Sequence, residues 1–288
     1  MKNPIPKVED LLRAPAYIKA YKDVDFLNRD DLRPVRLQLE LLKPELLQNE
    51  QHIVSTIVVF GSARCSDLET ARAKWDAEKE DLARNPDDRA ARRAVERAAK
   101  SLEHAQYYEA ARAFSRIASE AGQLPEGKGF REFVVVTGGG PGIMEAGNRG
   151  AWEAGAKSIG LNITLPHEQA PNAYITPELC FNFHYFAIRK MHFLLRARAM
   201  VAFPGGFGTL DELFETLTLI QTRKMPAIPI ILFNRCFWER IVNFHALVDE
   251  GVIASEDIAL FHYAETPEEA WEMIFSYYER TIPEGPRI

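Results

Sequence analysis

Several features that would point to a function class are scarce in this chain of 288 residues. Its three cysteines, Cys65, Cys180 and Cys236, are far apart and show no metal-binding or redox spacing, so we expect neither a disulfide framework nor a structural zinc. The net charge is -6, which argues against a nucleic-acid partner. No long apolar run or signal-like N-terminus is present, so we expect a cytoplasmic protein without a membrane partner.

What is present is the composition of an ordinary globular protein, with 47% hydrophobic and 26% charged residues. Residues 1–51 are polar and punctuated by proline, and Pro34 is placed to begin a helix. We therefore predict an N-terminal helical extension that lies on the main domain. The domain itself is predicted over 52–282, and a short tail over 283–288.

Short apolar and β-branched runs alternate with helical segments along this domain. Strands are predicted at 53–60, 133–137, 157–165, 179–183, 201–203, 227–233 and 258–263. The alternation predicts an α/β fold, a doubly wound and mostly parallel sheet with helices on both faces. Ligands of such sheets bind beyond the carboxyl ends of the strands.

An insertion at about 66–107 is rich in Ala, Glu, Lys and Arg and predicts a helical hairpin. Asn85 is placed to cap its second helix and Pro86 to open it. Apolar positions are sparse and the charges of both signs nearly cancel. This favours a solvent-exposed hairpin, or arm, over a surface that binds nucleic acid.

Three glycine-rich turns follow predicted strands, and the third leads into a helix. Glycine lets backbone N–H groups approach an anion at a helix N-terminus, where the helix dipole favours negative charge. The second turn fits neither the dinucleotide nor the P-loop pattern. The candidate phosphate-binding residues in these turns are Gly61, Ser62, Gly138, Gly139, Gly140, Gly205, Gly206, Gly208 and Thr209.

Thr209 and Glu212 admit two interpretations. The pattern T-x-x-E is a capping box, in which the threonine caps a helix and the glutamate reaches back to its N–H. Alternatively, Glu212 is a catalytic carboxylate. Its context favours catalysis, because the cations Arg189 and Lys190 precede it on a separate predicted helix, and phosphate recognition uses such groups.

The run Pro204 to Glu212, P-G-G-F-G-T-L-D-E, resembles the P-G-G-x-G-T-x-x-E signature of the Lonely Guy (LOG) family, nucleotide phosphoribohydrolases often mislabelled lysine decarboxylases. The turn from Gly138 to Met144 is similar to the family's G-G-G-x-x-G-x-M element. Glu145 stands where shorter relatives have a small residue, and complementing the helix dipole is one role open to it.

The position of Arg189 strengthens the resemblance, which covers roughly Ile53 to Tyr278 outside the arm. Arg189 precedes Glu212 by 212 − 189 = 23 residues, the spacing expected from relatives. The preceding dipeptide, Phe186-Ala187, replaces the Met-His of short members, which bears on the choice of base.

The resemblance implies cleavage of a nucleoside 5'-monophosphate, of the AMP or cytokinin-riboside type, to free base and ribose 5-phosphate. It also implies a homodimer or higher homo-oligomer that needs no cofactor. An oxocarbenium-like transition state requires nearby negative charge and an activated water, a role that we assign to Glu212. Arg189 is expected to hold the substrate and favour base departure, and Lys190 to bind phosphate.

Two histidines are further candidates for the site, and two other functions are alternatives to hydrolysis. His184 and His192 are candidate acids, although a histidine beside aromatic residues is more often part of the core. A non-catalytic carrier of a nucleotide or of the molybdenum cofactor (a pterin) would use the glycine turns without needing Arg189 and Glu212. Lysine decarboxylation would require a pyridoxal-phosphate lysine, and no such context surrounds Lys190 or Lys224.

Overall fold

The computed structural model describes residues 5–123, 129–164 and 170–281. Across these residues, seven parallel strands form one sheet in the order β4-β3-β2-β1-β5-β6-β7. The strands are β1 Thr56–Phe60, β2 Val134–Thr137, β3 Ser158–Ile163, β4 Cys180–Phe183, β5 Ala197–Ala202, β6 Ile230–Phe233 and β7 His262–Ala264. The chain moves outward from β1 to β4 and then crosses to β5 on the other side of β1. This reversal makes the β1–β5 boundary the switch point, where such sheets bind ligands.

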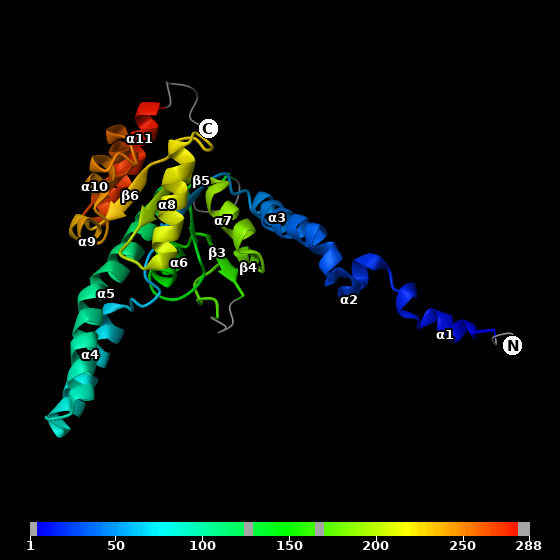
Figure 1. Cartoon of the computed structure of the whole chain (residues 1–288), viewed down its shortest axis with the longest axis horizontal. Helices are drawn as coiled ribbons and strands as arrows, with labels where there is room; N and C mark the ends of the chain where they lie inside the picture. The colour runs from blue at the N-terminus through cyan, green and yellow to red at the C-terminus, as the bar shows by residue number, and fades with distance from the viewer. Residues whose placement is uncertain (1–4, 124–128, 165–169, 282–288) are drawn as a thin grey trace.

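Helices cover both faces of the sheet, so the predicted doubly wound α/β fold is confirmed (Figure 1). Ile57 and Val59 of β1 face a core with α5, α6 and α11, whereas Val58 faces a core with α7, α8, α9 and α10. The longer helices are α3 Arg33–Glu50, α4 Leu68–Arg84, α5 Arg89–Gly122, α6 Ile143–Glu153, α7 Phe186–Leu194, α8 Phe207–Gln221, α9 Arg235–Ile241, α10 Phe244–Asp249 and α11 Pro267–Thr281. Within the described ranges, no helix is long and apolar enough to cross a membrane.

Two predicted elements differ from the structure. The strand placed at 201–203 begins at Ala197, because Ala199 and Met200 pair with β1 and lie in the core. The strand placed at 258–263 is mostly a 3-10 helix, Ser255–Leu260, and β7 follows it. Both errors arise because pairing and burial, which depend on distant segments, set strand limits more strongly than local propensity.

The N-terminal extension lies on the domain only through α3. That helix continues through Pro44 and contacts α7. Residues 5–32, which include α1 Val8–Leu12 and α2 Val24–Leu27, extend away from the sheet (Figure 1). The prediction that the extension as a whole lies on the domain was therefore wrong for its first part.

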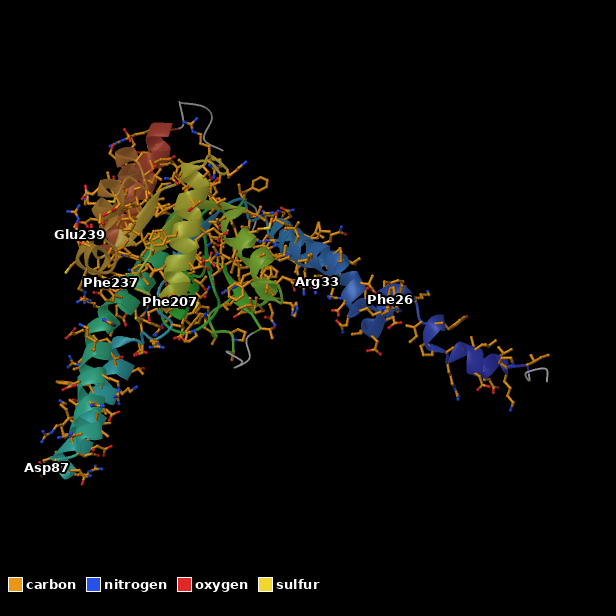
Figure 2. The ribbon with its side chains drawn as sticks, in the orientation of Figure 1. Phe26, Arg33, Asp87, Phe207, Phe237 and Glu239 are labelled. Carbon is orange, nitrogen blue, oxygen red and sulfur yellow. The ribbon has the colours of Figure 1, made fainter. Side chains whose placement is uncertain are left out.

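The helical hairpin α4–α5 projects from another side of the domain, with Asp87 near its tip (Figure 2). Its second helix does not open at Pro86. The Asp88 carboxylate accepts a hydrogen bond from the N–H of Ala90 at 2.7 Å, so the helix begins at Arg89, while Asn85 ends α4. The predicted exposed hairpin is thus present with a different cap.

Deletion of residues 67–103 is expected to leave a folded domain. The only fully buried side chains of the hairpin in this range are Ala71 and Ala98, whereas α5 packs in the main core from Tyr107 onward. By contrast, Phe114→Ala in the core part of α5 should cost about 3–5 kcal/mol of unfolding free energy. Thermal melting of both variants tests this, and an insoluble deletion product beside a folded Phe114→Ala would assign the hairpin to the core.

Candidate active site

The loops that follow β1, β2 and β5 lie together at the switch point. The N–H of Ser62 donates to the carbonyl of Pro204, and the N–H of Ile143 donates to the carbonyl of Ser62, both at 3.0 Å. Gly142 has φ +73°, and a Cβ there would lie 2.3 Å from the Ser62 carbonyl oxygen. A Cβ on Gly61 would lie 2.6 Å from Ile143. Close contact between loops therefore requires these two glycines, and the Ser62 N–H is already used within the protein.

The predicted phosphate-binding glycines fall into two groups. Gly139 has φ +74°, and a Cβ there would lie 2.3 Å from Asn162 Oδ1, so backbone conformation and packing explain this glycine. Around Gly206 and Gly208, a Cβ would meet no described atom within 4 Å, and neither residue has a positive φ. Open space next to these backbones leaves room for a ligand to approach them.

The capping-box interpretation of Thr209 and Glu212 is wrong. Helix α8 begins at Phe207 with Gly206 as its N-cap, so Thr209 is the third helical residue and Glu212 the sixth. Among the residues that the structure describes, no acceptor bonds to the backbone N–H groups of 205–209. The first turn of a long helix therefore presents unpaired donors at the carboxyl edge of the sheet.

Glu212 lies on the inward face of α8. Thr209, Leu213, Thr216 and Glu212 are all buried at helical spacing, and Glu212 is only 5% exposed. The side chain of Thr209 packs on Gly205, where a Cβ would lie 2.1 Å from its hydroxyl oxygen. No described donor lies within hydrogen-bond distance of the Glu212 carboxylate. A buried carboxylate without such a partner is costly to a fold and is typical of functional sites.

The protonation of Glu212 is set mainly by burial, which raises its pKa from 4.5 to about 7. Lys190 and Arg189 lower this pKa, whereas the carboxylates of Glu215 and Asp211 raise it. Near neutral pH this carboxyl group is therefore poised to gain or release a proton, the property required of a general base.

Arg189 extends from α7 over the second glycine loop. Its Nε donates to the carbonyl of Leu161 in β3 at 2.7 Å, and its guanidinium carbon lies 5.2 Å from the centre of the Phe193 ring. A Cβ on Gly138 would lie 2.7 Å from Arg189 Nη2, so this glycine makes room for the guanidinium. Burial lowers the pKa of Arg189, and the charge of Glu212 opposes that shift. The structure thus brings the predicted cation and carboxylate into one electrostatic unit.

Comparison with known families agrees with the sequence resemblance. Residues 144–274 match the family model described as "Possible lysine decarboxylase". This segment is similar to that family, to which the LOG proteins belong. The matched segment contains Arg189 and the whole third glycine turn through Glu212, but not the hairpin, the loop after β1 or Gly138 to Gly142 of the second glycine turn.

Solved structures cover more of the chain than the family model does. The structural genomics target TM1055 has 21% identity, covers 77% of this chain and 99% of its own, and superposes with a TM-score of 0.46. The molybdenum cofactor carrier protein from Chlamydomonas reinhardtii has 16% identity, covers 78% of this chain and 99% of its own, and gives a TM-score of 0.45. No curated protein sequence matches at a significant level.

Lys190, which was predicted to bind phosphate, is paired with carboxylates within the protein. Its ammonium group forms ion pairs with Asp211 at 2.8 Å and Glu215 at 3.0 Å, both on α8. Burial lowers its pKa, but the hydrogen bonds to these carboxylates outweigh burial and raise it. Lys190 therefore joins α7 to α8, and its charge is already compensated before any phosphate binds.

Among the described residues, neither candidate histidine contacts Arg189 or Glu212. His184 is exposed, and its ring packs edge-on against Tyr185. His192 is buried against α3, with Nε2 3.2 Å from the carbonyl oxygen of Glu40, and burial lowers its pKa. The interpretation of His192 as a core residue is confirmed.

Polar residues that were not predicted from the sequence hold the second glycine loop of the candidate site. The side-chain amide of Asn172 donates to the carbonyls of Gly139 and Gly140 at 3.1 and 3.0 Å, and to Asn148 Oδ1 at 2.9 Å. Asn148 is fully buried in α6, and a buried asparagine in the apolar stripe of a helix is the one signal that could have indicated this network.

Glu145 has a specific partner as well as a place in the first turn of α6. The hydroxyl of Tyr108 in α5 donates to Glu145 Oε1 at 2.8 Å. Helix-dipole complementation is therefore not its whole role. The bond ties the helix after the second glycine loop to the helix that continues into the hairpin.

Other features of the described residues lie apart from this site or give no metal centre. A cavity of about 1110 Å³ opens at the opposite edge of the sheet, near Val54, Ala197 and Ile228, which precede or begin strands. Within the described ranges, no group of three or more His, Cys, Asp or Glu side chains is arranged to hold a metal ion.

Proposed function

We propose that this protein hydrolyses the N-glycosidic bond of a nucleoside 5'-monophosphate and releases the free base and ribose 5-phosphate. The observation that carries the proposal is the buried Glu212 carboxyl group, with a pKa of about 7 and Arg189 beside it, on a helix whose first turn has unpaired N–H donors. A site used for binding alone has no need of a carboxylate held in this state.

The phosphate is bound by the backbone of 205–209 at the start of α8. These N–H groups have no acceptor among the described residues, and the helix dipole adds positive potential. Gly206 and Gly208 leave their backbones open to the phosphate oxygens. Arg189 supplies the nearby cation, because the charge of Lys190 is compensated by Asp211 and Glu215.

Glu212 acts in its ionised form. It accepts a proton from water as the water oxygen bonds to C1' of the ribose, and its negative charge stabilises the oxocarbenium-like transition state. The bond from C1' to the base nitrogen breaks, and the electron pair leaves with the base. The protonated carboxyl group then returns its proton to the base, which restores the starting state.

Aromatic rings flank the proposed ribose site and offer surfaces for the base. Phe186 is half exposed, and its ring centre lies 5.7 Å from the guanidinium carbon of Arg189. Phe207 is 93% exposed at the start of α8 (Figure 2). Stacking on such rings is worth about 1–3 kcal/mol per base and tolerates different bases.

Lysine decarboxylation, the activity in the family description, is not supported by the site. A Schiff-base lysine must lose its proton to react, whereas the pKa of Lys190 is raised by its ion pairs. Lys224 is exposed just beyond the end of α8, on the first turn that follows it.

The test is incubation with a panel of nucleoside 5'-monophosphates and the matching nucleosides, followed by chromatography of the released base. We expect cleavage of at least one monophosphate and at least about 100-fold less cleavage of its nucleoside, because the N–H groups of 205–209 need a phosphate. Equal cleavage of both would refute the phosphate site. Binding of nucleotides without cleavage would instead support a non-catalytic carrier.

A further inference from the structure

Helix α3 of the N-terminal extension holds the beginning of α7, the helix that carries Arg189. The Glu40 carboxylate of α3 accepts two hydrogen bonds from consecutive backbone groups, the N–H of His184 at 2.8 Å and the N–H of Tyr185 at 3.1 Å. Tyr185 is the N-cap of α7, and its own side chain makes no capping bond. A carboxylate from another helix therefore takes the place of a local cap.

Glu40 is linked to the backbone of Arg189 through a single residue, Tyr185. The N–H of Tyr185 donates to Glu40, and the carbonyl of Tyr185 accepts the first hydrogen bond of α7 from the N–H of Arg189 at 3.2 Å. Contacts that hold the backbone of Tyr185, on both sides of its Cα, thus fix where α7 starts. They consequently fix the direction in which the Arg189 side chain leaves the helix.

A second side chain on the same face of α3 fixes the same residue. Arg36 lies one helical turn before Glu40, and its Nε donates to the Tyr185 hydroxyl at 3.1 Å. Two contacts, one to the backbone and one to the side chain, therefore hold Tyr185 from α3.

A further set of polar contacts of α3 lies at the other end of α7. Glu45 forms an ion pair with Arg196 at 2.8 Å, and its carboxylate lies 3.8 Å from His192 Nδ1. Arg196 follows α7, so Glu45 docks α3 without contacting the beginning of the helix. The two glutamates of α3 thus allow docking and positioning to be separated.

We propose that Glu40 is a positioning residue, which orients Arg189 for the cleavage of the glycosidic bond by fixing the first turn of α7. The proposal rests on the proposed function. It gives α3 a defined task at a site formed by residues more than a hundred positions later in the chain. The backbone N–H donors of 205–209 do not depend on α3 and would stay in place, so loss of Glu40 should affect turnover more than substrate binding.

The experiment compares Glu40→Ala with Glu45→Ala, a matched control on the same helix. For Glu40→Ala we expect kcat to fall at least about 10-fold with KM changed less than threefold, since small misplacements of a catalytic group are costly. Glu45→Ala should keep kcat within twofold, even if it melts at a lower temperature. The kcat of Glu40→Gln, which retains one acceptor oxygen, should lie between those of the wild type and Glu40→Ala. Glu40→Gln replaces Glu40→Ala in the comparison if the alanine variant does not fold.

Amide hydrogen exchange gives a readout that does not depend on the substrate. The amides of His184, Tyr185 and Arg189 should exchange at least about 10-fold faster in Glu40→Ala but not in Glu45→Ala. Unchanged exchange at these amides, or equal losses of kcat in both alanine variants, would overturn the positioning role. If the wild type cleaves no nucleotide, the proposed function fails, and the exchange comparison still decides whether Glu40 holds α7.

Discussion

Glu212→Gln is expected to be almost inactive while remaining folded. Glutamine has the same shape but accepts no proton from water and carries no negative charge, so kcat should fall by about 10²- to 10⁴-fold. The variant should still be stabilised by a bound nucleoside monophosphate, because the N–H donors of 205–209 are unchanged. Initial rates and ligand-dependent melting measure the two properties separately.

The same substitution should make the protein more stable above pH 7. Folding raises the pKa of Glu212 from its ordinary value of 4.5 to about 7, so ionisation is disfavoured in the folded protein. Below pH 4.5 the group is protonated in both the folded and the unfolded chain and costs nothing. The cost grows as the pH rises towards 7 and is then complete, at about 3 kcal/mol. Glutamine removes this cost, which corresponds to roughly 5 to 10 °C in melting temperature at pH 8.

Two further measurements test whether the loss of activity in Glu212→Gln comes from the loss of the general base. The kcat/KM of the wild type should rise with pH and level off above about 7, as the base ionises. Glu215→Gln is the control, because Glu215 lies one turn further along α8 and pairs with Lys190. It should keep most of the activity. Normal turnover by Glu212→Gln would show that another group is the base.

Arg189→Ala should lower kcat/KM by about 10²-fold or more without unfolding the protein. The Arg189 guanidinium forms no ion pair among the described residues, and a charge-assisted contact to phosphate or ribose is lost with it. Arg189→Lys should recover little of the lost activity. The guanidinium has several N–H donors in fixed directions and can bind the Leu161 carbonyl and a substrate together, which an ammonium group cannot do.

The pH dependence of Arg189→Ala provides an internal check. Arg189 lowers the pKa of Glu212, so its removal should shift the rising limb of the profile to higher pH. Loss of activity with an unshifted limb would place Arg189 away from Glu212. Unchanged turnover would remove Arg189 from the site altogether.

Much of the fold and the position of the site could be predicted from local sequence. Runs such as 56–60 are continuous and β-branched because parallel strands are buried on both faces, and each glycine turn directly follows a strand. Those two facts place the three loops at one edge of the sheet. Arg189 and Glu212 could be assigned to this edge because each lies on a helix that follows a strand.

The parts that could not be predicted depend on contacts between distant segments. The T-x-x-E pattern suggests a cap at Thr209, but α8 starts at Phe207, and this change turns Glu212 towards the core. The ion-pair partners of Lys190 could not be predicted either, since they belong to another helix. Glu40 and Tyr185 are 145 residues apart, and no local pattern records their contact.

The most direct test of catalysis by Glu212 is a short incubation of the wild type with AMP in water enriched in ¹⁸O, with Glu212→Gln in parallel. Mass spectrometry of early products should show free adenine and ribose 5-phosphate with one ¹⁸O at C1, and Glu212→Gln should form almost none. Adenosine with labelled phosphate, or labelled ribose 5-phosphate formed equally fast by Glu212→Gln, would contradict the assignment of glycosidic hydrolysis to Glu212.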